Sequence, residues 1–217
     1  MRTDQDGAAV RSTYGGQARR DQLVDCAISV LCERGFAGTT ISSVAQRAGV
    51  SKGVVTYHFP TKNELLMVVV ASLYERGGQQ IAERIETAGN ALDALLGYID
   101  ANLDFVAAHV RHVKAVIEIA GNLRRATGEL ALGSVEADPV TAQLRQLIET
   151  GVARGQFDAV NAEVLAMVIR SAIDAAAARR SLDDNFDMAD YSQGLQLLVR
   201  RAVEPHHARP GTGATRR

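Results

Sequence analysis

The sequence has little of what a β-rich, disulfide-bonded or membrane-spanning protein needs. Its 217 residues include no Trp, four Pro and two Cys, and aromatic residues make up only 5%. No segment sustains the alternation of apolar and polar residues that a strand requires, and no apolar run approaches the roughly 18 residues that cross a membrane. The hydrophobic fraction is nevertheless 47%, and a core of Ala, Leu, Val and Ile suits packing between helices. We predict an all-α protein.

The two cysteines and the chain termini exclude further classes. Cys26 and Cys32 are six residues apart, which fits neither a Cys-x-x-Cys redox pair nor half of a zinc site. We therefore predict packing roles for both, and neither metal nor cofactor. Residues 1–18 are polar and Gly-rich, unlike a signal peptide, so we expect a cytoplasmic protein without a membrane partner. Residues 1–18 and 205–217 lack a pattern that could be buried and are predicted to be disordered.

Charge is distributed unevenly along the chain. Residues 1–62 hold eight Lys or Arg and five Asp or Glu, a net +3, whereas the remainder holds 16 and 20, a net −4. No acidic residue occurs between Glu33 and Glu64, an interval that contains Arg47, Lys52 and Lys62. A compact unit without carboxylates favours a surface that faces a phosphate backbone. Three arginines of the N-terminal arm could either touch DNA or remain solvated: Arg11, Arg19 and Arg20.

Residues 39–65 predict two short helices joined by a tight turn, followed by a third helix. Thr40 and Ser51 are suitable N-caps for the first two helices, and Gly49 suits the left-handed residue that ends the first. Thr61 and Glu64 have the spacing of a capping box for the third helix. Ile41, Val44, Ala45, Ala48, Val50, Val55 and Phe59 supply the apolar positions. This periodicity alone also fits an ordinary helical hairpin.

The same segment closely resembles the DNA-binding domain of the tetracycline-repressor (TetR) family of transcriptional regulators. The matching residues are Thr39-Thr40, Ala45, Ala48-Gly49-Val50-Ser51, Gly53, His58-Phe59, Lys62 and Leu65, preceded by an apolar helical stripe of Leu23, Ala27, Val30 and Leu31. Thr56 departs from the family pattern, which often has an aromatic residue there. The resemblance covers about residues 19–66. It implies a three-helix helix-turn-helix domain, followed over 67–204 by a larger helical domain for effector binding and dimerisation.

The resemblance implies a double-stranded DNA operator as partner. Lys52, Gly53, Val54 and Thr56 lie at the predicted base-reading end of the second helix, where Lys52 can donate to guanine and Val54 can touch a thymine methyl group. Tyr57, His58 and Lys62 match family positions that contact phosphates. The remaining predicted DNA contacts begin the two helices: Thr40, Ser42 and Ser51.

Beyond this domain, the sequence predicts a helix from Thr61 that Gly77-Gly78 either kinks or merely weakens. Further helices are expected at about 90–108, 110–123, 138–153, 160–181 and 187–203, with a loop at 126–138. The last two helices carry the predicted homodimer interface, a stripe of small and branched residues: Leu165, Ala166, Ile169, Ala172, Ile173, Tyr191, Leu195 and Leu198. Some of these residues must instead belong to the core of one chain.

The small-molecule effector site is the least visible feature. Its candidates are polar or aromatic residues inside apolar runs: Tyr74, Tyr98, Asn102, Phe105, His109, His112, Glu118, Asn122 and Asp174. Asp174 is a candidate buried carboxylate that could pair with a cationic ligand or with an Arg across the dimer. His109 and His112 form His-x-x-His but lack a third ligand at suitable spacing, so no metal is predicted.

We predict a dimeric repressor that a small molecule releases from its operator. Two alternatives remain: a helical DNA-binding protein without an effector, and an all-helical enzyme such as a hydrolase or a carboxylate-bridged metal protein.

Overall fold

The computed structural model describes residues 4–127 and 139–205, and within them it contains nine α-helices and no strand. The helices are α1 (Asp4–Gly38), α2 (Ile41–Ala48), α3 (Lys52–His58), α4 (Lys62–Glu86), α5 (Ala91–Ala108), α6 (Val110–Thr127), α7 (Pro139–Ala153), α8 (Ala162–Leu182) and α9 (Met188–Val203). The predicted all-α class is confirmed. None of these helices is long and apolar enough to cross a membrane.

The helices divide into two compact units. The first contains α1, α2, α3, the part of α4 up to Gln79, and α6. The second contains the rest of α4, then α5, α7, most of α8, and α9. The first unit therefore extends beyond the predicted 19–66 domain, because α6 and the first part of α4 belong to it.

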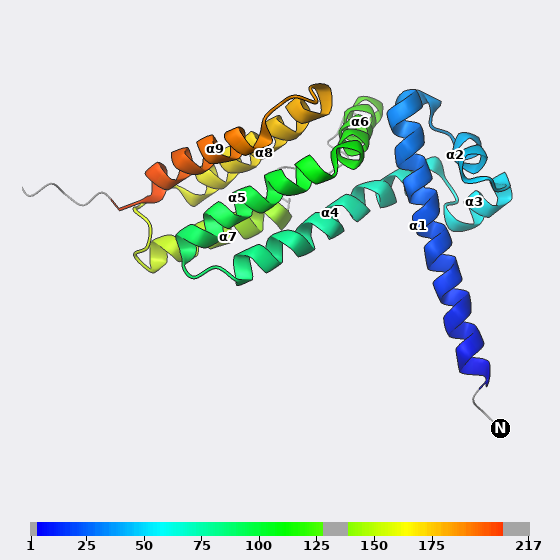
Figure 1. Cartoon of the computed structure of the whole chain (residues 1–217), viewed down its shortest axis with the longest axis horizontal. Helices are drawn as coiled ribbons and strands as arrows, with labels where there is room; N and C mark the ends of the chain where they lie inside the picture. Colours follow the sequence, from blue (N-terminus) through cyan, green and yellow to red (C-terminus); the bar gives the residue numbers. More distant parts are fainter. Residues whose placement is uncertain (1–3, 128–138, 206–217) are drawn as a thin grey trace, which may run out of the picture. The chain divides into compact units, whose positions relative to one another are not determined.

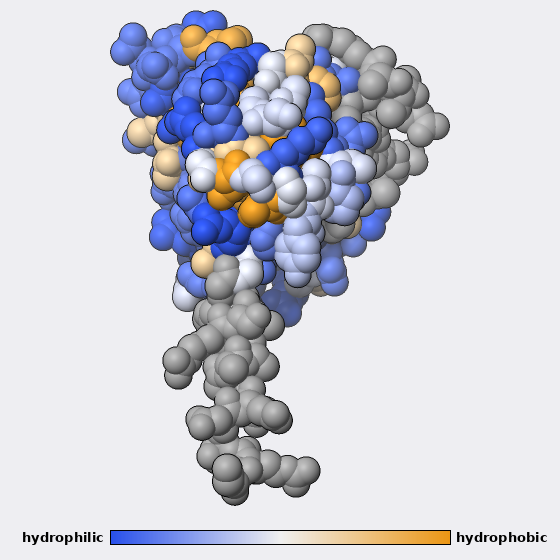
Figure 2. Space-filling model, turned by 90° about the vertical axis from the view of Figure 1, so that its right-hand side faces the viewer, coloured by the Kyte–Doolittle hydropathy of each residue, from blue (hydrophilic) through white to orange (hydrophobic). Residues whose placement is uncertain are grey.

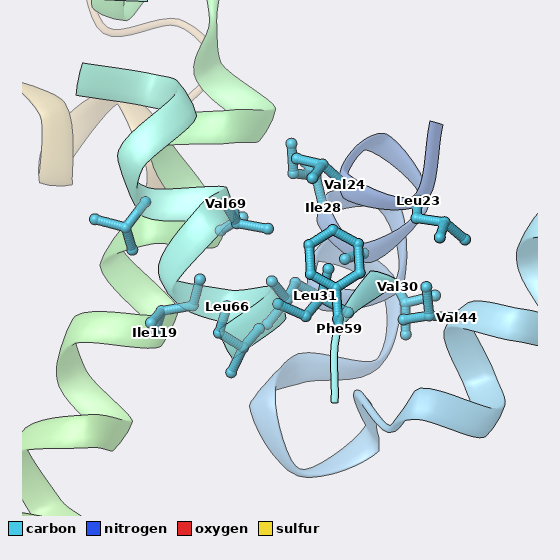
Figure 3. Close-up of a cluster of buried hydrophobic side chains, with 14 of the residues drawn as sticks. Leu23, Val24, Ile28, Val30, Leu31, Val44, Phe59, Leu66, Val69 and Ile119 are labelled. Atoms are coloured by element: carbon cyan, nitrogen blue, oxygen red, sulfur yellow. The ribbon is translucent and has the colours of Figure 1, made fainter. Parts of the chain in front are cut away.

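The core of the first unit is an apolar cluster to which α1, α2, α3, α4, α6 and the residue after α3 contribute. Figure 3 shows the Phe59 ring inside this cluster. Its neighbours there include Leu23, Val24, Ile28, Val30 and Leu31 of α1, Val44 of α2, Leu66 and Val69 of α4, and Ile119 of α6. Phe59 is almost completely buried, and truncating such a residue to Ala typically costs about 3–5 kcal/mol. The side chains that the sequence assigns to one face of α1 and α2 thus hold the unit together.

Helix α1 is longer than expected and changes direction near its end. It begins at Asp4, so the prediction of a disordered arm is wrong from that residue onward. Missing apolar residues argue against burial but not against a helix, which satisfies its backbone hydrogen bonds internally. Near the other end, Gly35 has φ 68° and ψ −178°, a backbone conformation that strongly favours glycine. Thr39 follows the end of α1, and its hydroxyl donates to the Gly35 carbonyl at 2.8 Å.

Helix α4 begins with a variant of the predicted capping box. The Thr61 hydroxyl oxygen accepts the Glu64 backbone N–H at 3.1 Å, as predicted. The Glu64 carboxylate binds the Thr61 hydroxyl at 3.0 Å, where a capping box has it bind the backbone N–H of the cap residue. Gly77-Gly78 does not interrupt the helix, which continues to Glu86.

In the second unit, α5, α7, α8 and α9 run side by side (Figure 1). Each forms near the range predicted for it, because its apolar residues recur at helical spacing. The turn after α7 depends on Gly151: a Cβ there would lie 2.3 Å from ring atoms of the buried Phe157. Of the predicted loop at 126–138, helix α6 includes the first two residues, and 128–138 lie outside the described residues, as do 206–217 of the predicted tail.

Candidate nucleic-acid interface

Helix α2 begins and ends, and helix α3 begins, at the capping residues that the sequence predicts. The Thr40 hydroxyl oxygen accepts the Ser43 N–H at 3.0 Å, and the Ser43 hydroxyl in turn accepts the Thr40 N–H at 2.8 Å. Gly49 has φ 67° and ψ 31°, the left-handed conformation expected of it. The Ser51 hydroxyl accepts the Val54 N–H at 3.3 Å. Gly49 and Ser51 thus define the short turn between α2 and α3.

Helix α3 buries one face and exposes the other. Val55 is fully buried, whereas Lys52 and Gly53 are exposed at its N-terminal end and Tyr57 is 84% exposed. An aromatic side chain this exposed on a rigid helix is available to a partner. Figure 2 shows the side of the molecule that carries α2 and α3, and this surface is mainly hydrophilic with a small hydrophobic group near its centre.

Three other predicted DNA contacts, Thr56, His58 and Ser42, differ in their exposure and in their partners. Thr56 is half-buried, and its hydroxyl lies 3.1 Å from the carbonyl oxygens of both Lys52 and Gly53. Its proton is therefore used inside α3. The His58 ring is half-buried and lies edge-on to the Tyr57 ring, with centroids 5.2 Å apart. Ser42 is exposed on the first turn of α2.

Two of the three predicted basic residues have internal partners. Both carboxylate oxygens of Glu33 lie 2.7 Å from the Arg47 guanidinium. The Lys62 ammonium donates to the Phe36 carbonyl at 2.6 Å and lies 3.9 Å from the centroid of the Phe36 ring. Burial also lowers the pKa of the Lys62 ammonium. Of these charges, that of Arg47 is balanced by a carboxylate, whereas Lys62 keeps its charge and is held by Phe36.

Residues 49–53 also contain the spacing Gly-x-Ser-x-Gly, which in α/β-hydrolases marks a nucleophile at a strand-to-helix turn. Here the turn joins two helices, and no strand occurs among the described residues. The Ser51 hydroxyl caps α3. This arrangement is that of a helix-turn-helix and not of a nucleophile elbow.

The predicted effector residues are divided between the two units. Tyr74, His109, His112, Glu118 and Asn122 belong to the first unit, and Tyr98, Asn102, Phe105 and Asp174 to the second. No group of three or more potential metal ligands occurs among the described residues.

Two of the first-unit candidates join α6 to neighbouring helices. His112 is buried, and its Nε2 lies 2.8 Å from the Val69 carbonyl oxygen. Burial is the main cause that lowers the pKa of His112; Arg76 and His109 act in the same direction, while the Val69 hydrogen bond and Asp25 oppose it. The Glu118 carboxylate accepts the Phe36 N–H at 3.1 Å and the Asn122 amide at 3.1 Å. These residues have structural partners at the end of α1 and in α4.

In the second unit, Arg170 organises the polar candidates. Its guanidinium donates to the Asn102 side-chain oxygen at 3.2 Å, and its Nε donates to Asp174 at 3.2 Å. Although burial acts to lower it, the pKa of Arg170 is raised by the Asp174 hydrogen bond and charge and by Tyr98. The side chain of Asp174 is 63% exposed. The prediction that this carboxylate is buried is therefore wrong, because it pairs with the arginine one turn earlier on the same helix.

Two hollows in the second unit are lined by other residues. One, of about 400 Å³, is lined by Arg84, Thr87, Ala88, Gly89, Asp93, Leu96, Gly97, Asp100 and Gln196. The other, of about 310 Å³, is lined by Gln80, Glu83, Arg84, Thr87, Ala101 and Asp104. At the first, the Asp100 carboxylate accepts from Arg84 at 3.1 Å and from Gln196 at 3.3 Å. The sequence did not predict these residues, because polar, charged and small side chains of this kind also occur on ordinary exposed faces of helices such as α4 and α5.

The predicted interface stripe also needs correction. Ala166, Ile169 and Ile173 of α8 are fully buried within the single chain, and Leu195 of α9 is nearly so. Tyr191 and Ala172 contact each other, with the Tyr191 hydroxyl donating to the Ala172 carbonyl at 2.8 Å. Of the predicted stripe, Leu198 is exposed and Leu165 is half-buried.

A different apolar face of these two helices is exposed. It consists of Val164, Met167 and Val168 of α8 with Leu197 and Leu198 of α9. We call these five residues the outer α8–α9 face. Helical periodicity identifies an apolar stripe but does not determine whether that stripe faces the rest of the chain.

The geometry of the first unit defines a helix-turn-helix protein, and comparison with known proteins agrees. Residues 23–69 match the model of the bacterial regulatory proteins, tetR family. Over 102 residues the chain is 30% identical to the HTH-type transcriptional regulator BetI of Cronobacter sakazakii, covering 46% of this chain and 50% of that protein. It is 45% identical over 76 residues to the HTH-type transcriptional regulator CymR of Pseudomonas putida, covering 34% and 36%. The chain thus spans half or less of the length of these curated relatives.

A solved TetR transcriptional regulator from Chloroflexus aurantiacus has the same fold, with a TM-score of 0.73 and 21% identity over 89% of this chain and 100% of that one. The helix-turn-helix region of this chain, residues 23–69, is thus that of the tetR family of bacterial regulatory proteins.

Proposed function

We propose that this protein is a transcriptional repressor that binds a near-palindromic DNA operator as a homodimer and is released by a small molecule. The observation that carries this proposal is the exposed N-terminal end of α3. That end is held by the Ser51 cap and by the buried Val55, and Lys52 and Gly53 are exposed there. Tyr57 is exposed near the other end of α3. A short helix anchored on one face and exposed on the other suits insertion into a major groove.

The exposed and half-buried residues of α3 have roles that their chemistry supports. Lys52 donates to guanine O6 or N7, and Val54 contacts a thymine methyl group. Gly53 lets the DNA approach the backbone closely. Tyr57 and His58 contact phosphates, which fixes the register without reading sequence. Thr56 has a smaller part than the sequence suggested, because its hydroxyl proton is used within α3.

We propose that the outer α8–α9 face forms the homodimer interface. Exposed apolar side chains gathered on two adjacent helices favour burial against a second copy. A dimer also increases sequence specificity. Each mismatched base pair reduces the binding free energy by only about 1–3 kcal/mol, so a single recognition helix discriminates weakly. Two recognition helices related by a two-fold axis double the number of base pairs read and require a near-palindromic operator.

The effector site that we propose lies in the second unit. Two hollows there have polar and charged linings, which supports a polar small molecule more than a purely hydrophobic one. Such a ligand releases DNA only if it binds more tightly to the conformation that does not fit the operator.

A selection experiment tests the central claim. The purified protein is incubated with genomic fragments at low ionic strength, and bound duplexes are recovered and sequenced. We expect a near-palindromic motif whose affinity falls steeply with salt. Lys52→Met should weaken binding and relax base preference at defined positions, whereas Lys114→Met, at an exposed lysine of α6, should leave both unchanged. Recovery of no enriched duplex would contradict the proposal, and DNA binding that no small molecule reverses would indicate a regulator without an effector.

A further inference from the structure

The predicted DNA interface has fewer available positive charges than its sequence suggests. Arg47 is paired with Glu33, and the Lys62 ammonium is bonded to the Phe36 carbonyl. Of the Lys and Arg residues within 39–65, all of which the structure describes, Lys52 alone has neither kind of partner. A protein that binds DNA through its phosphates needs several such charges.

Helix α1 supplies a further charge beside α3. Arg20 precedes the buried residues Leu23 and Val24 by three and four positions, so it lies on the helix face that packs against the core of the first unit. Its guanidinium carbon lies 5.0 Å from the centroid of the Phe59 ring. Phe59 directly follows the last residue of α3. Arg20 is therefore positioned at the C-terminal end of the recognition helix.

The nearby acids lie on another face of α1. At about 100° per residue, Asp21 and Asp25 point well away from Arg20, and both are exposed. Asp21 instead accepts a hydrogen bond from Gln17 at 2.9 Å. The contact between Arg20 and the Phe59 ring orients the guanidinium without neutralising its charge, unlike a salt bridge.

Arg19 adds to this positive surface. It is exposed, and its guanidinium donates to the side-chain oxygen of Gln22 at 2.7 Å. A neutral amide leaves the charge of Arg19 intact and holds the side chain along α1.

We propose that Arg20, with Arg19 beside it, forms a second phosphate-contacting element, carried by α1 and not by the helix-turn-helix. This inference rests on the proposed DNA-binding function and extends it to the backbone beside the base pairs read by α3. The seven residues of α3 separate Lys52 from Phe59 by roughly 10 Å along the helix axis. Arg20 and Lys52 therefore contact different phosphates or bases. The planar guanidinium suits a phosphate because it can donate two parallel hydrogen bonds.

The test compares the salt dependence of DNA binding by variants of the full chain on one selected operator duplex. Arg20→Gln keeps the length of the stem and removes the charge. Its slope of log affinity against log salt should be shallower by about 0.9 per bound protomer. Over a fourfold rise in salt, its affinity should fall about 3.5-fold less per protomer than that of the wild type. Arg20→Lys should keep the wild-type slope, and base preference should be the same for all three.

Arg34→Gln, at an exposed arginine near the other end of α1, is the matched control and should keep the wild-type slope. An unchanged slope for Arg20→Gln, with steep salt dependence in the wild type, would overturn this inference and leave the proposed function intact. A lowered unfolding temperature with equal loss of affinity at every salt concentration would also overturn it, because the role of Arg20 would then be to pack on Phe59. If the wild type itself binds no duplex, the proposed function fails first.

Discussion

The same substitution at Lys52 and at Lys62 should affect different properties of the protein. Lys62 sits at the start of α4, where its ammonium bonds the Phe36 carbonyl near the end of α1 at 2.6 Å. Lys52 is exposed at the start of α3. Methionine retains most of the aliphatic stem and removes the charge. We therefore expect Lys62→Met to affect mainly stability and Lys52→Met to affect mainly DNA binding.

The magnitude for Lys62 follows from its contacts. A hydrogen bond from a charged donor contributes about 1.5–3 kcal/mol, and a partly exposed contact with an aromatic ring about 0.5–1 kcal/mol. Two effects reduce the loss of stability. Burial already disfavours the charged form of the Lys62 ammonium. The Phe36 carbonyl still accepts a hydrogen bond from the Thr39 N–H at 3.3 Å after the substitution. We expect a loss of about 2 kcal/mol, which for a chain of this size lowers the melting temperature by about 4–8 °C.

Calorimetry or thermal circular dichroism measures the first effect, and a salt titration of operator binding measures the second. Lys62→Met should melt earlier and keep the wild-type salt slope. Lys52→Met should melt like the wild type and bind DNA more weakly. The reasoning is refuted if Lys62→Met leaves the melting temperature unchanged and makes the slope shallower by about 0.9 per protomer, because that is the signature of a phosphate contact.

Three further predictions concern other parts of the molecule. Val168→Glu places a charge on the outer α8–α9 face and should give folded monomers in sedimentation, whereas Ala166→Asp, at a fully buried position, should unfold the chain; folded dimers of Val168→Glu would locate the interface elsewhere. Burial lowers the pKa of His112 below 6.5, so the unfolded chain takes up its proton more readily than the folded one. Stability should therefore be complete above pH 6.5 and fall as the pH decreases toward the folded pKa, and unfolding titrations of His112→Gln should lack this component. Gly49→Ala should cost about 1 kcal/mol in chemical denaturation, because φ is 67° while no atom obstructs the added Cβ; an unchanged midpoint would contradict the role of its backbone conformation.

The sequence predicted the helix-turn-helix well because the signals there are local. A cap such as Thr40 or Ser51 binds a backbone N–H three residues away, and Gly49 adopts its conformation through its own missing side chain. Such interactions depend on residue type and short spacing alone. The helices of the second unit were predicted for the same reason, since apolar periodicity is visible along the chain.

The electrostatics of the site were predicted less well, because charge pairs form between distant residues. Arg47 is 14 residues from Glu33, and Lys62 is 26 residues from Phe36. The acid-free interval is a correct observation about the sequence, yet folding brings a carboxylate to it from α1. The partners of the effector candidates are equally distant in sequence, since His112 and Glu118 have hydrogen-bond partners on other helices of the first unit.

By itself, the sequence determined most of the helical segments, the caps of the helix-turn-helix and the family that its N-terminal domain resembles, because these depend on contacts within a few residues. The exception is the start of α1, which is helical without a pattern that could be buried. Only the tertiary structure decided which stripe of α8 is buried, which basic residues keep their charge available and which compact unit includes α6. These properties depend on the direction in which each helix faces its neighbours, and helical periodicity describes a face without specifying what covers it.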